Sequence, residues 1–361
     1  MNKLEIANQT VFFTSSENME EVKSDSITLI ATSPPYWNAR DYKNVNQIGF
    51  KQSYQDYIKA LNRVWKECIR VLQPNGKIAI NLQPLPISNK QSGFNRRIIQ
   101  NIMFDIEKFM RKNDLFLSGM HYWDKSSYVN NVSWGSYPKP TNIASNTSFE
   151  QIFVWVKRGN TRKIPKETLN QNLLDKTEWR HWAVRCIWDD IAPVIKISSK
   201  GENLFGHPAP FPEDIPYRLI RMHTVEGEYV LDPFLGSGTT LKICRILNRK
   251  GIGYELNPEY RELIEQRIRE DWTPPPIESD YVTIGSETVK DLILKAIEVT
   301  WKNKTRISNQ DNEISKEKAY IYSKILKEYS KNSIFTKTFL RKLGLKRKLT
   351  RYKSMEQFIE D

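Results

Sequence analysis

Short apolar runs alternate with longer amphipathic segments along most of this chain, and this alternation constrains the fold more than any other feature. Apolar runs of this length are typical of buried strands, and the amphipathic segments between them are typical of helices that connect parallel strands. The sequence therefore predicts an α/β fold with a mostly parallel, seven-stranded sheet. The expected strands span Thr10 to Thr14, Ile27 to Thr32, Lys77 to Leu82, Leu115 to Trp123, Phe149 to Lys157, Glu228 to Asp232 and Gly251 to Glu255.

Helices are expected between these strands, where apolar residues recur every three or four positions. One of them is followed by Pro74-Asn75-Gly76, a turn sequence that leads into the next strand. The expected helices lie near Tyr54 to Leu72, Phe94 to Lys112, Glu213 to His223, Thr239 to Asn248 and Pro258 to Asp271.

Two regions depart from the alternation. Residues 158–203 mix basic, amide and aromatic side chains without a clear period, which indicates an insertion. After residue 272 the sequence TPPPI has the composition of a stiff linker, and residues 278–361 look like a basic, mainly helical extension. Extra phosphate contacts, docking on the main body and a dimer contact all remain open as roles for this extension. The main domain is then expected in two halves, residues 1–157 and 204–272.

Charge and residue counts narrow the class of protein. Fifty-five Lys and Arg against 42 Asp and Glu give a net charge of +13, which suits a polyanionic partner but is also common in basic enzymes. Three scattered cysteines indicate a reducing compartment, and four histidines without metal-site spacing predict no metal. The sequence does not start like a secretory leader, and no apolar run approaches the roughly 20 residues of a membrane span. We therefore expect a cytoplasmic protein without a membrane segment.

The apolar run that ends at Thr32 is followed at once by a serine, two prolines and two aromatic residues, Ser33 to Trp37. Proline fixes φ and removes an N–H donor, so this corner should be rigid and should lie at the carboxyl edge of the sheet, where α/β proteins bind ligands. A hydroxyl and carbonyl acceptors beside an aromatic face suit a flat heterocycle that carries an exocyclic amine. An ordinary Pro-Pro loop is the alternative for this segment taken alone.

A second cluster, Val230 to Thr240, comprises the end of a strand, a glycine turn and the start of a helix. Gly236 and Gly238 allow close approach of the backbone, and Thr239 or Thr240 could cap the helix. The sequence matches neither the Walker loop nor GxGxxG, which disfavours a nucleotide phosphate as the ligand. Glu255 ends the next strand and is placed to accept both hydroxyls of a ribose.

Together the two clusters resemble the motifs of the beta-type DNA amino-methyltransferases. Thr32 to Tyr36 is similar to that family's Ser/Asp-Pro-Pro-Tyr catalytic motif, and Asp232 to Thr240 is similar to its Asp-Pro-Phe-x-Gly-Ser-Gly-Thr-Thr cofactor motif. The catalytic motif comes first, as in the circularly permuted members. The resemblance covers about residues 10 to 270 and includes His207 to Pro212, which is similar to the segment that precedes the cofactor strand.

This resemblance implies a Rossmann-like methyltransferase fold, S-adenosyl-L-methionine as cofactor and double-stranded DNA as partner, with a homodimer as an open option. It also implies a target base that is flipped out of the duplex and stacked on Tyr36. The residues implied for catalysis are Ser33, Pro34, Pro35 and Tyr36, and those implied for cofactor binding are Asp232, Phe234, Gly236, Ser237, Gly238, Thr239 and Glu255.

Serine at the first motif position is more typical of cytosine-N4 enzymes, whereas aspartate is more typical of adenine-N6 enzymes, so Ser33 favours cytosine. Methylation of cytosine C5 needs a cysteine nucleophile, typically after a proline, and none of the three cysteines follows a proline. The resemblance points to the modification enzyme of a prokaryotic restriction-modification system, associated with the nucleoid. The alternatives are an adenine-N6 enzyme, a catalytically silent nucleic-acid-binding relative, and a methyltransferase that acts on RNA or on a protein amide.

The chain departs from the family at the end of the first expected strand. Family members commonly carry an aspartate there that contacts the adenine of the cofactor, whereas this chain has Thr14-Ser15-Ser16. A serine hydroxyl or a main-chain group could replace that contact, and a simple cap of the strand end is the alternative.

Contact with DNA is expected from the insertion, interpreted as the target-recognition region, and from the loop between Trp123 and Pro140. Basic residues could contact phosphates or guanine edges, although a solvated basic face with core tryptophans is the alternative. The candidates are Lys157, Arg158, Arg162, Lys163, Lys166, Arg180 and Arg185, interleaved with Trp179 and Trp182.

Overall fold

A computed structural model divides the chain into two compact units, Met1–Pro275 and Pro276–Asp361, with the boundary inside the proline-rich linker. In the second unit the structure describes residues 276–277 and the antiparallel pair β12 (Tyr281–Val282) and β13 (Phe335–Thr336), so the predicted helical extension lies almost entirely outside the described residues. In the first unit the structure describes residues 2–38, 46–93, 96–126, 147–194 and 212–275.

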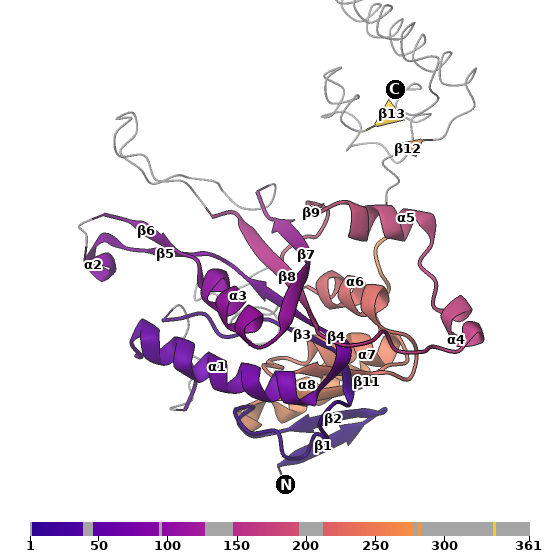
Figure 1. Ribbon diagram of the computed structural model, residues 1–361, viewed down its shortest axis with the longest axis horizontal. Coiled ribbons are helices and arrows are strands. Elements are labelled where there is room, and N and C mark those ends of the chain that lie inside the picture. Colours follow the sequence, from indigo (N-terminus) through magenta and orange to yellow (C-terminus); the bar gives the residue numbers. More distant parts are fainter. Residues whose placement is uncertain are drawn as a thin grey trace, which may run out of the picture. The chain divides into compact units, whose positions relative to one another are not determined.

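The first unit is built on a nine-stranded sheet with the order β1-β2-β11-β10-β3-β4-β8-β7-β9 (Figure 1). β2, β11, β10, β3 and β4 run parallel to one another, and β8 lies antiparallel between β4 and β7. The predicted α/β class with a mostly parallel sheet is confirmed. The strands are β1 (Lys3–Ile6), β2 (Gln9–Phe12), β3 (Ile27–Thr32), β4 (Leu72–Leu82), β7 (Leu115–Asp124), β8 (Phe149–Lys157), β9 (Ile187–Trp188), β10 (Tyr229–Asp232) and β11 (Lys250–Tyr254).

The seven expected strands are all present, but the prediction of a seven-stranded sheet is wrong because each edge carries one strand more. β1 joins β2 through a turn at Ala7 and Asn8, whose φ angles are 46° and 62°, and no glycine marks this turn in the sequence. β9 pairs in parallel with the end of β7 but is only two residues long, too short to produce a recognisable pattern.

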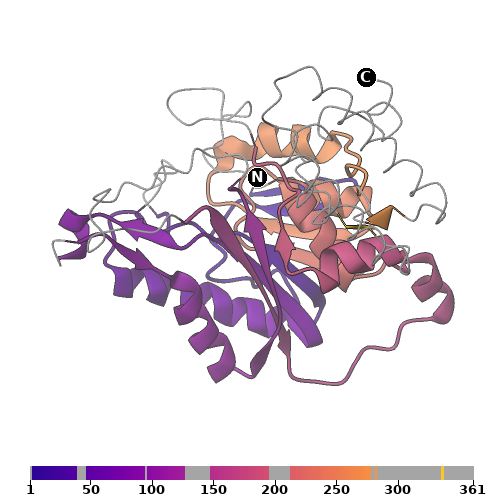
Figure 2. The ribbon, with the colours of Figure 1, turned by 90° about the horizontal axis from the view of Figure 1, so that it is seen from above.

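Helices cover both faces of the sheet (Figures 1 and 2). α1 (Tyr54–Val71) and α3 (Ile102–Lys112) pack on one face, while α6 (Asp214–His223) and α7 (Thr239–Ile246) pack on the other. α8 (Arg261–Arg269), preceded by the 3-10 turn η3 (Pro258–Tyr260), packs beside α7 against β1 and β2. β3 lies at the centre and is buried at all six positions, which explains its uninterrupted apolar sequence.

One expected helix is half replaced by an extended element. The helix predicted over Phe94 to Lys112 begins only at Ile102, where the Asn101 side chain accepts a hydrogen bond from the Met103 N–H and caps α3. The segment before it forms a hairpin of β5 (Leu85–Ile87) and β6 (Ile98–Gln100), with the short helix α2 (Asn89–Ser92) at its tip. We call residues 83–101 the arm.

Residues 158–194 lead from the amino ends of the parallel strands to their carboxyl ends. Ion pairs hold this segment on the body. Arg162 contacts Glu228 and the His223 carbonyl at the start of this run. Arg218 of α6 forms two hydrogen bonds with Asp190 near its end, at 2.6 and 3.1 Å. The elements between are α4 (Lys166–Gln171), α5 (Lys176–Glu178) and the π-helical turn η2 (Trp179–Val184).

Candidate active site

The two sequence clusters meet at the carboxyl edge of the sheet. β10 pairs in parallel with β3, with Val230 opposite Leu29 and Leu231 opposite Ile30. Where both strands end, the Thr32 hydroxyl donates a 2.6 Å hydrogen bond to Asp232 Oδ1 in the buried interior. The two motifs therefore lie side by side where these strands end, although about 200 residues separate them in the chain.

We call the corner from Ser33 to Tyr36 the base wall, after the role that the sequence predicts for it, and neighbouring aromatic residues hold it in place. The Tyr57 hydroxyl of α1 donates to the Pro35 carbonyl at 2.9 Å. The indole N–H of Trp37 donates to the Gln52 carbonyl at 2.9 Å, and its ring packs edge-on against Tyr54. Tyr36 and Trp37 are both partly buried and pack against the core cluster of α1 and α3.

Ser33 itself is half-buried, and no described residue forms a hydrogen bond with its hydroxyl. Pro34 beside it is buried, and it cannot donate a main-chain hydrogen bond. The Ser33 hydroxyl thus has no hydrogen-bond partner among the described residues, three positions before Tyr36 in the chain.

Glu150, a buried carboxylate that the sequence analysis missed, accepts a hydrogen bond from Tyr36. Glu150 Oε2, at the start of β8, accepts from the Tyr36 hydroxyl at 3.1 Å and from Asn81 Nδ2 at 2.5 Å. Its Oε1 accepts from Lys125 Nζ at 2.6 Å, and the Lys125 and Glu150 side chains are only 13% and 10% exposed. The one available signal was a carboxylate at the second position of the otherwise apolar strand FEQIFVWVK.

We call the glycine turn that joins β10 to α7 the cofactor wall, after the role that the sequence predicts for it. Gly236 and Gly238 have φ angles of 56° and 92°, in the left-handed region that favours glycine. Gly238 is the N-cap of α7, and no described side chain caps the helix. The expectation that Thr239 or Thr240 caps α7 is wrong, because the Thr240 hydroxyl donates instead to Asp232 Oδ2 at 2.6 Å.

Asp232 is fully buried and organises this wall. Its carboxylate accepts hydrogen bonds from the Thr32 and Thr240 hydroxyls and from the Phe234 N–H. Burial raises the pKa of Asp232 to about 6, and the two threonine hydroxyls offset part of that rise. The Phe234 ring packs edge-on against Trp65, which ties the turn to the core.

Glu255 follows β11 and contacts the glycine turn directly. Its carboxylate accepts from the Gly236 N–H at 2.9 Å and from the Asn257 N–H at 2.8 Å. Although the side chain keeps some contact with solvent, surrounding protein raises the pKa of Glu255 to about 7, and the two N–H donors limit the rise. A Cβ at Gly253 would lie 2.6 Å from Leu235, so glycine there lets the turn pack closely on β11.

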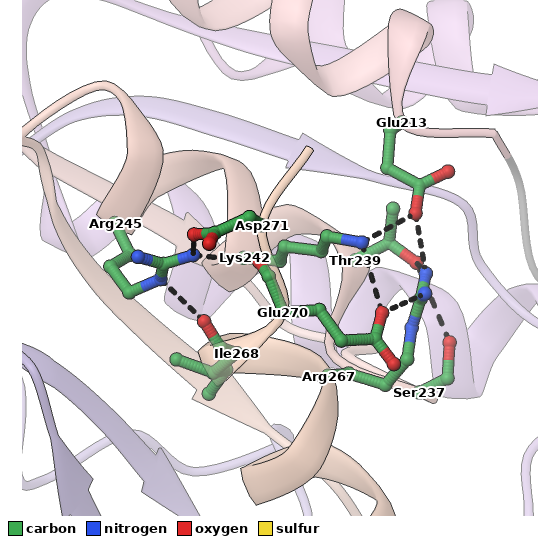
Figure 3. Close-up of polar contacts among 9 residues, drawn as sticks. All are labelled: Glu213, Ser237, Thr239, Lys242, Arg245, Arg267, Ile268, Glu270 and Asp271. Carbon is green, nitrogen blue, oxygen red and sulfur yellow. Dashed lines mark hydrogen bonds and ion pairs between the residues drawn. The ribbon is translucent and has the colours of Figure 1, made fainter. Parts of the chain in front are cut away.

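Beneath the turn lies a buried network of two cations and two carboxylates (Figure 3). Lys242 of α7 and Arg267 of α8 each pair with both Glu213 and Glu270 at 2.7–3.0 Å, and the two cationic side chains are 4% exposed. Arg267 also donates to the Thr239 hydroxyl at 3.4 Å. The network fixes the start of α7 and commits both cations to carboxylates.

The electrostatics of this wall suit a ligand with hydroxyl donors and a positive charge. Its described acidic groups are Asp232 and Glu255, and its nearest described cations, Lys242 and Arg267, are already paired below the turn. A phosphate would be repelled by these carboxylates, whereas ribose hydroxyls and a sulfonium cation would be attracted. The residues present therefore fit S-adenosyl-L-methionine better than a nucleotide phosphate.

At the end of β2, Ser15 acts as a local cap. Its hydroxyl accepts a 3.2 Å hydrogen bond from the Glu17 N–H, and Ser16 is buried. The capping alternative for Ser15 thus agrees with the structure.

The basic residues expected to contact DNA are divided between the two ends of the strands. Lys157 ends the antiparallel strand β8, so it lies at the edge opposite the site, where it donates to the Leu72 carbonyl and pairs with Asp25. Arg158 pairs with Asp114 and Arg162 with Glu228, also at that edge. All three side chains therefore form ion pairs at the end of the strands opposite the candidate site.

Further along the insertion the candidates differ in exposure. Arg180 and Trp179 are exposed, Arg185 pairs with Asp189 at 2.6 Å, and Trp182 is buried against Tyr217. Lys163 and Lys166 are exposed on the segment that contains α4. Residues 127–140, 195–203 and 207–211, which include the rest of the predicted DNA loop and most of the segment before the cofactor strand, lie outside the described residues.

Within the described ranges no helix combines the length and apolar character needed to cross a membrane. The same ranges hold no cluster of three or more His, Cys, Asp or Glu side chains suited to a metal ion.

Comparison with known proteins gives one consistent family. A family model described as DNA methylase, of the N6/N4 type, matches residues 27–266. The type II methyltransferase M.MthZI of Methanothermobacter thermautotrophicus is 30% identical over 277 residues, 72% of this chain and 76% of its own length. M.MjaI of Methanocaldococcus jannaschii is 31% identical over 287 residues, 72% of this chain and 91% of its own.

Solved structures share the fold. TTHA0409 of Thermus thermophilus, a proposed DNA modification methylase solved with S-adenosyl-L-methionine, superposes with a TM-score of 0.56 at 28% identity, covering 72% of this chain and 94% of its own. The cytosine-N4-specific PvuII DNA methyltransferase superposes with a TM-score of 0.51 over 79% of this chain and 90% of its own. At 20% identity the second likeness supports the fold alone.

Proposed function

This chain belongs to the DNA methylase family of the N6/N4 type, and from that premise we propose that it methylates the exocyclic N4 amine of cytosine in duplex DNA. The donor is S-adenosyl-L-methionine, which supplies an electrophilic methyl group on a sulfonium cation. One observation carries the proposal: the Thr32–Asp232 hydrogen bond joins the end of the base wall to the end of the cofactor wall. A base on one wall and a methyl donor on the other would then face each other across this junction.

The cofactor wall offers distinct groups to the parts of the donor. Glu255 would accept from the ribose hydroxyls, and its position against the Gly236 N–H fixes that carboxylate to the turn. Three hydrogen-bond donors converge on the buried carboxylate of Asp232, and these bonds keep the turn in one conformation. The residues proposed to hold the donor are Asp232, Phe234, Gly236, Ser237, Gly238, Thr239 and Glu255.

The base wall would bind a cytosine flipped out of the duplex, which costs a few kcal/mol. Tyr36 would stack on the ring, and its hydroxyl is anchored on Glu150. The Ser33 hydroxyl and the Pro34 carbonyl would accept from the amine, which orients its nitrogen for in-line attack and raises its electron density. The amine can lose its proton after transfer, so this step needs no strong general base.

The choice of cytosine rests on Ser33, since serine in this motif is more typical of N4 enzymes. Serine and aspartate can both accept from an amine, so adenine N6 is the second candidate and would use the same two walls. The alternative of a silent, DNA-binding relative is opposed by the intact corner and glycine turn. Because several relatives are type II methyltransferases, we place the activity in a prokaryotic restriction-modification system, within the cytoplasm at the nucleoid.

The test is incubation of the full chain with duplex DNA and methyl-labelled S-adenosyl-L-methionine, followed by digestion and chromatography of the nucleosides. We expect label in N4-methylcytosine. Label in N6-methyladenine would show that the target base is adenine and not cytosine, while methylation of an exocyclic amine of DNA would stand. Calorimetry with the donor runs in parallel: donor binding without label in any nucleoside would support the silent alternative and contradict the proposal.

A further inference from the structure

The arm, residues 83–101, leaves the sheet beside the base wall. It continues directly from the carboxyl end of β4, and β4 pairs with β3 so that Ile80 lies opposite Thr32, the residue before the Ser33 corner. Figures 1 and 2 show the β5–β6 hairpin and α2 extending away from the sheet and from α3. The arm therefore starts at the candidate site and reaches outward from it.

The base of the arm is firmly attached to the body. Leu85 and Ile87 of β5 are buried and belong to the core cluster of α1 and α3. Gln83 accepts from Lys125 Nζ at 3.2 Å and donates to the Thr147 carbonyl at 2.7 Å. Because Lys125 also pairs with Glu150 behind Tyr36, the base of the arm and the base wall share one polar network.

The tip of the arm is folded by its own polar side chains. Ser88 and Gln91 form a capping box at the start of α2, and the Ser92 hydroxyl donates to the Arg96 carbonyl at 2.7 Å. Gly93 follows α2 with a φ of 71° and has open space where a Cβ would lie. The tip therefore presents a defined polar surface and contributes no buried side chain from α2.

The charge of the arm is entirely positive. Between Gln83 and Phe104 the sequence contains Lys90, Arg96 and Arg97 and no aspartate or glutamate. Lys90 and Arg96 are exposed, Arg97 is half-buried, and none of the three pairs with a carboxylate among the described residues. Lys157, Arg158 and Arg162, at the opposite end of the strands, by contrast each pair with a carboxylate.

We propose that the arm contacts the phosphate backbone of duplex DNA that flanks the flipped base, through Lys90, Arg96 and Arg97. This inference rests on the proposed function, since a duplex bound with one base at Ser33–Tyr36 must continue past that edge of the sheet. Unpaired cations beside a catalytic corner complement phosphates, and contacts to phosphate position a protein on DNA without reading sequence. The exposed hydrogen-bonding groups of the tip suit the same polyanion.

The test compares the full chain with a variant that carries Lys90→Gln, Arg96→Gln and Arg97→Gln. A matched control carries Lys66→Gln, Lys108→Gln and Lys112→Gln, which removes three exposed, unpaired charges from α1 and α3. DNA affinity is measured across a range of salt concentrations. Each phosphate contact contributes about 0.9 to the slope of log affinity against log salt, so the arm variant should lose about 2 to 3 from that slope while the control keeps it.

The arm variant should also raise KM for DNA about tenfold or more at low salt, with kcat at saturating DNA and affinity for S-adenosyl-L-methionine close to those of the unchanged chain. An unchanged salt slope would overturn the inference, and so would an equal loss in the control, which would indicate a diffuse effect of net charge. If the unchanged chain transfers no methyl group to DNA, the proposed function fails instead. A change of oligomeric state without a change of slope would assign the arm to protein contact and contradict the proposal.

Discussion

The cofactor wall and the base wall of the candidate site are assembled from the chain in different ways. Nine consecutive residues, Asp232 to Thr240, supply the strand end, the turn and the helix start of the cofactor wall, and Glu255 joins them from the adjacent strand. The base wall is a short corner whose supports, Tyr57, Asn81 and Glu150, come from α1, β4 and β8. One wall is therefore mainly local in the sequence, and the other depends on long-range contacts.

This difference predicts which quantity each wall controls. Changes in the cofactor wall should alter donor affinity or stability, because the wall contains Asp232 and Glu255 and rests on the network of Lys242 and Arg267. Changes in the base wall should alter kcat, since they affect the orientation of the base while leaving the turn intact.

The largest effect is expected at Tyr36. Tyr36→Ala removes the stacking surface and should lower kcat at least about 100-fold, because the amine is no longer held in line with the methyl group. Affinity for S-adenosyl-L-methionine, measured by calorimetry, should stay within about twofold. Tyr36→Phe keeps the ring and serves as the control, with a smaller loss. A nearly fully active Tyr36→Ala protein would refute the base-wall assignment.

The next largest effect is on stability. Arg267→Met leaves Glu213 and Glu270 with one cation between them and should lower the free energy of unfolding by about 3 kcal/mol, as measured by chemical denaturation. The control is Arg269→Gln, two residues along α8, whose pair with Glu265 is exposed and should contribute less than about 1 kcal/mol. Equal losses in the two variants would mean that the buried network does not support the turn.

Glu150→Gln tests whether the base wall can be altered without an effect on the cofactor wall. It keeps the shape of the side chain but leaves one acceptor oxygen in place of two and no charge, so the hydrogen bonds from Tyr36, Asn81 and Lys125 can no longer all form and Tyr36 is held less firmly. We expect kcat to fall about tenfold with donor affinity unchanged. Glu107→Gln, which alters a partly buried carboxylate on α3 away from the site, is the matched control. A loss of donor affinity in Glu150→Gln would contradict the separation of the walls.

A further predicted effect, similar in size to that of Glu150→Gln, is a dependence of donor affinity on pH. The raised pKa of Glu255, about 7, means that the free protein holds this carboxyl partly protonated at neutral pH. Binding of ribose hydroxyls and a cation favours the ionised form, so donor binding must release a proton below pH 7. Affinity should therefore rise about tenfold from pH 6 to pH 8. Glu255→Gln should weaken binding and flatten this profile, and a profile unchanged in that variant would assign the proton elsewhere.

The same raised pKa values have a consequence for folding. Glu255 and Asp232 bind protons more tightly in the folded chain than in the unfolded chain, whose carboxyl pKa values lie near 4. Stability contributed by these two groups is therefore present at low pH and is lost as pH rises through about 6 to 7. Thermal unfolding without ligand, compared with the Asp232→Asn and Glu255→Gln variants, measures this contribution.

Sequence reasoning succeeded where the determinants are local. The glycine turn requires particular residues at adjacent positions, and the corner after Thr32 depends on two consecutive prolines, so both can be located from the sequence alone. The buried central strands were predictable for the same reason, because their apolar runs are continuous.

The supports of the base wall could not be predicted, since Glu150 meets Tyr36 across 114 positions of the chain. The ion pairs of Lys157, Arg158 and Arg162 could not be predicted either. Their partners, Asp25, Asp114 and Glu228, come from distant segments of the chain. The arm was missed for a related reason. Ile98 and Ile99 continue the apolar pattern of α3 in sequence, but tertiary pairing with β5 makes them a strand.

The most direct test of the shared site is a crystal structure of the full chain with S-adenosyl-L-methionine. The account predicts that Glu255 contacts the ribose hydroxyls and that the sulfonium methyl points toward Ser33 and Tyr36, leaving room for an amine nitrogen about 3 to 3.5 Å from it. A donor bound away from the glycine turn, or a methyl group directed away from the Ser33–Tyr36 corner, would contradict it.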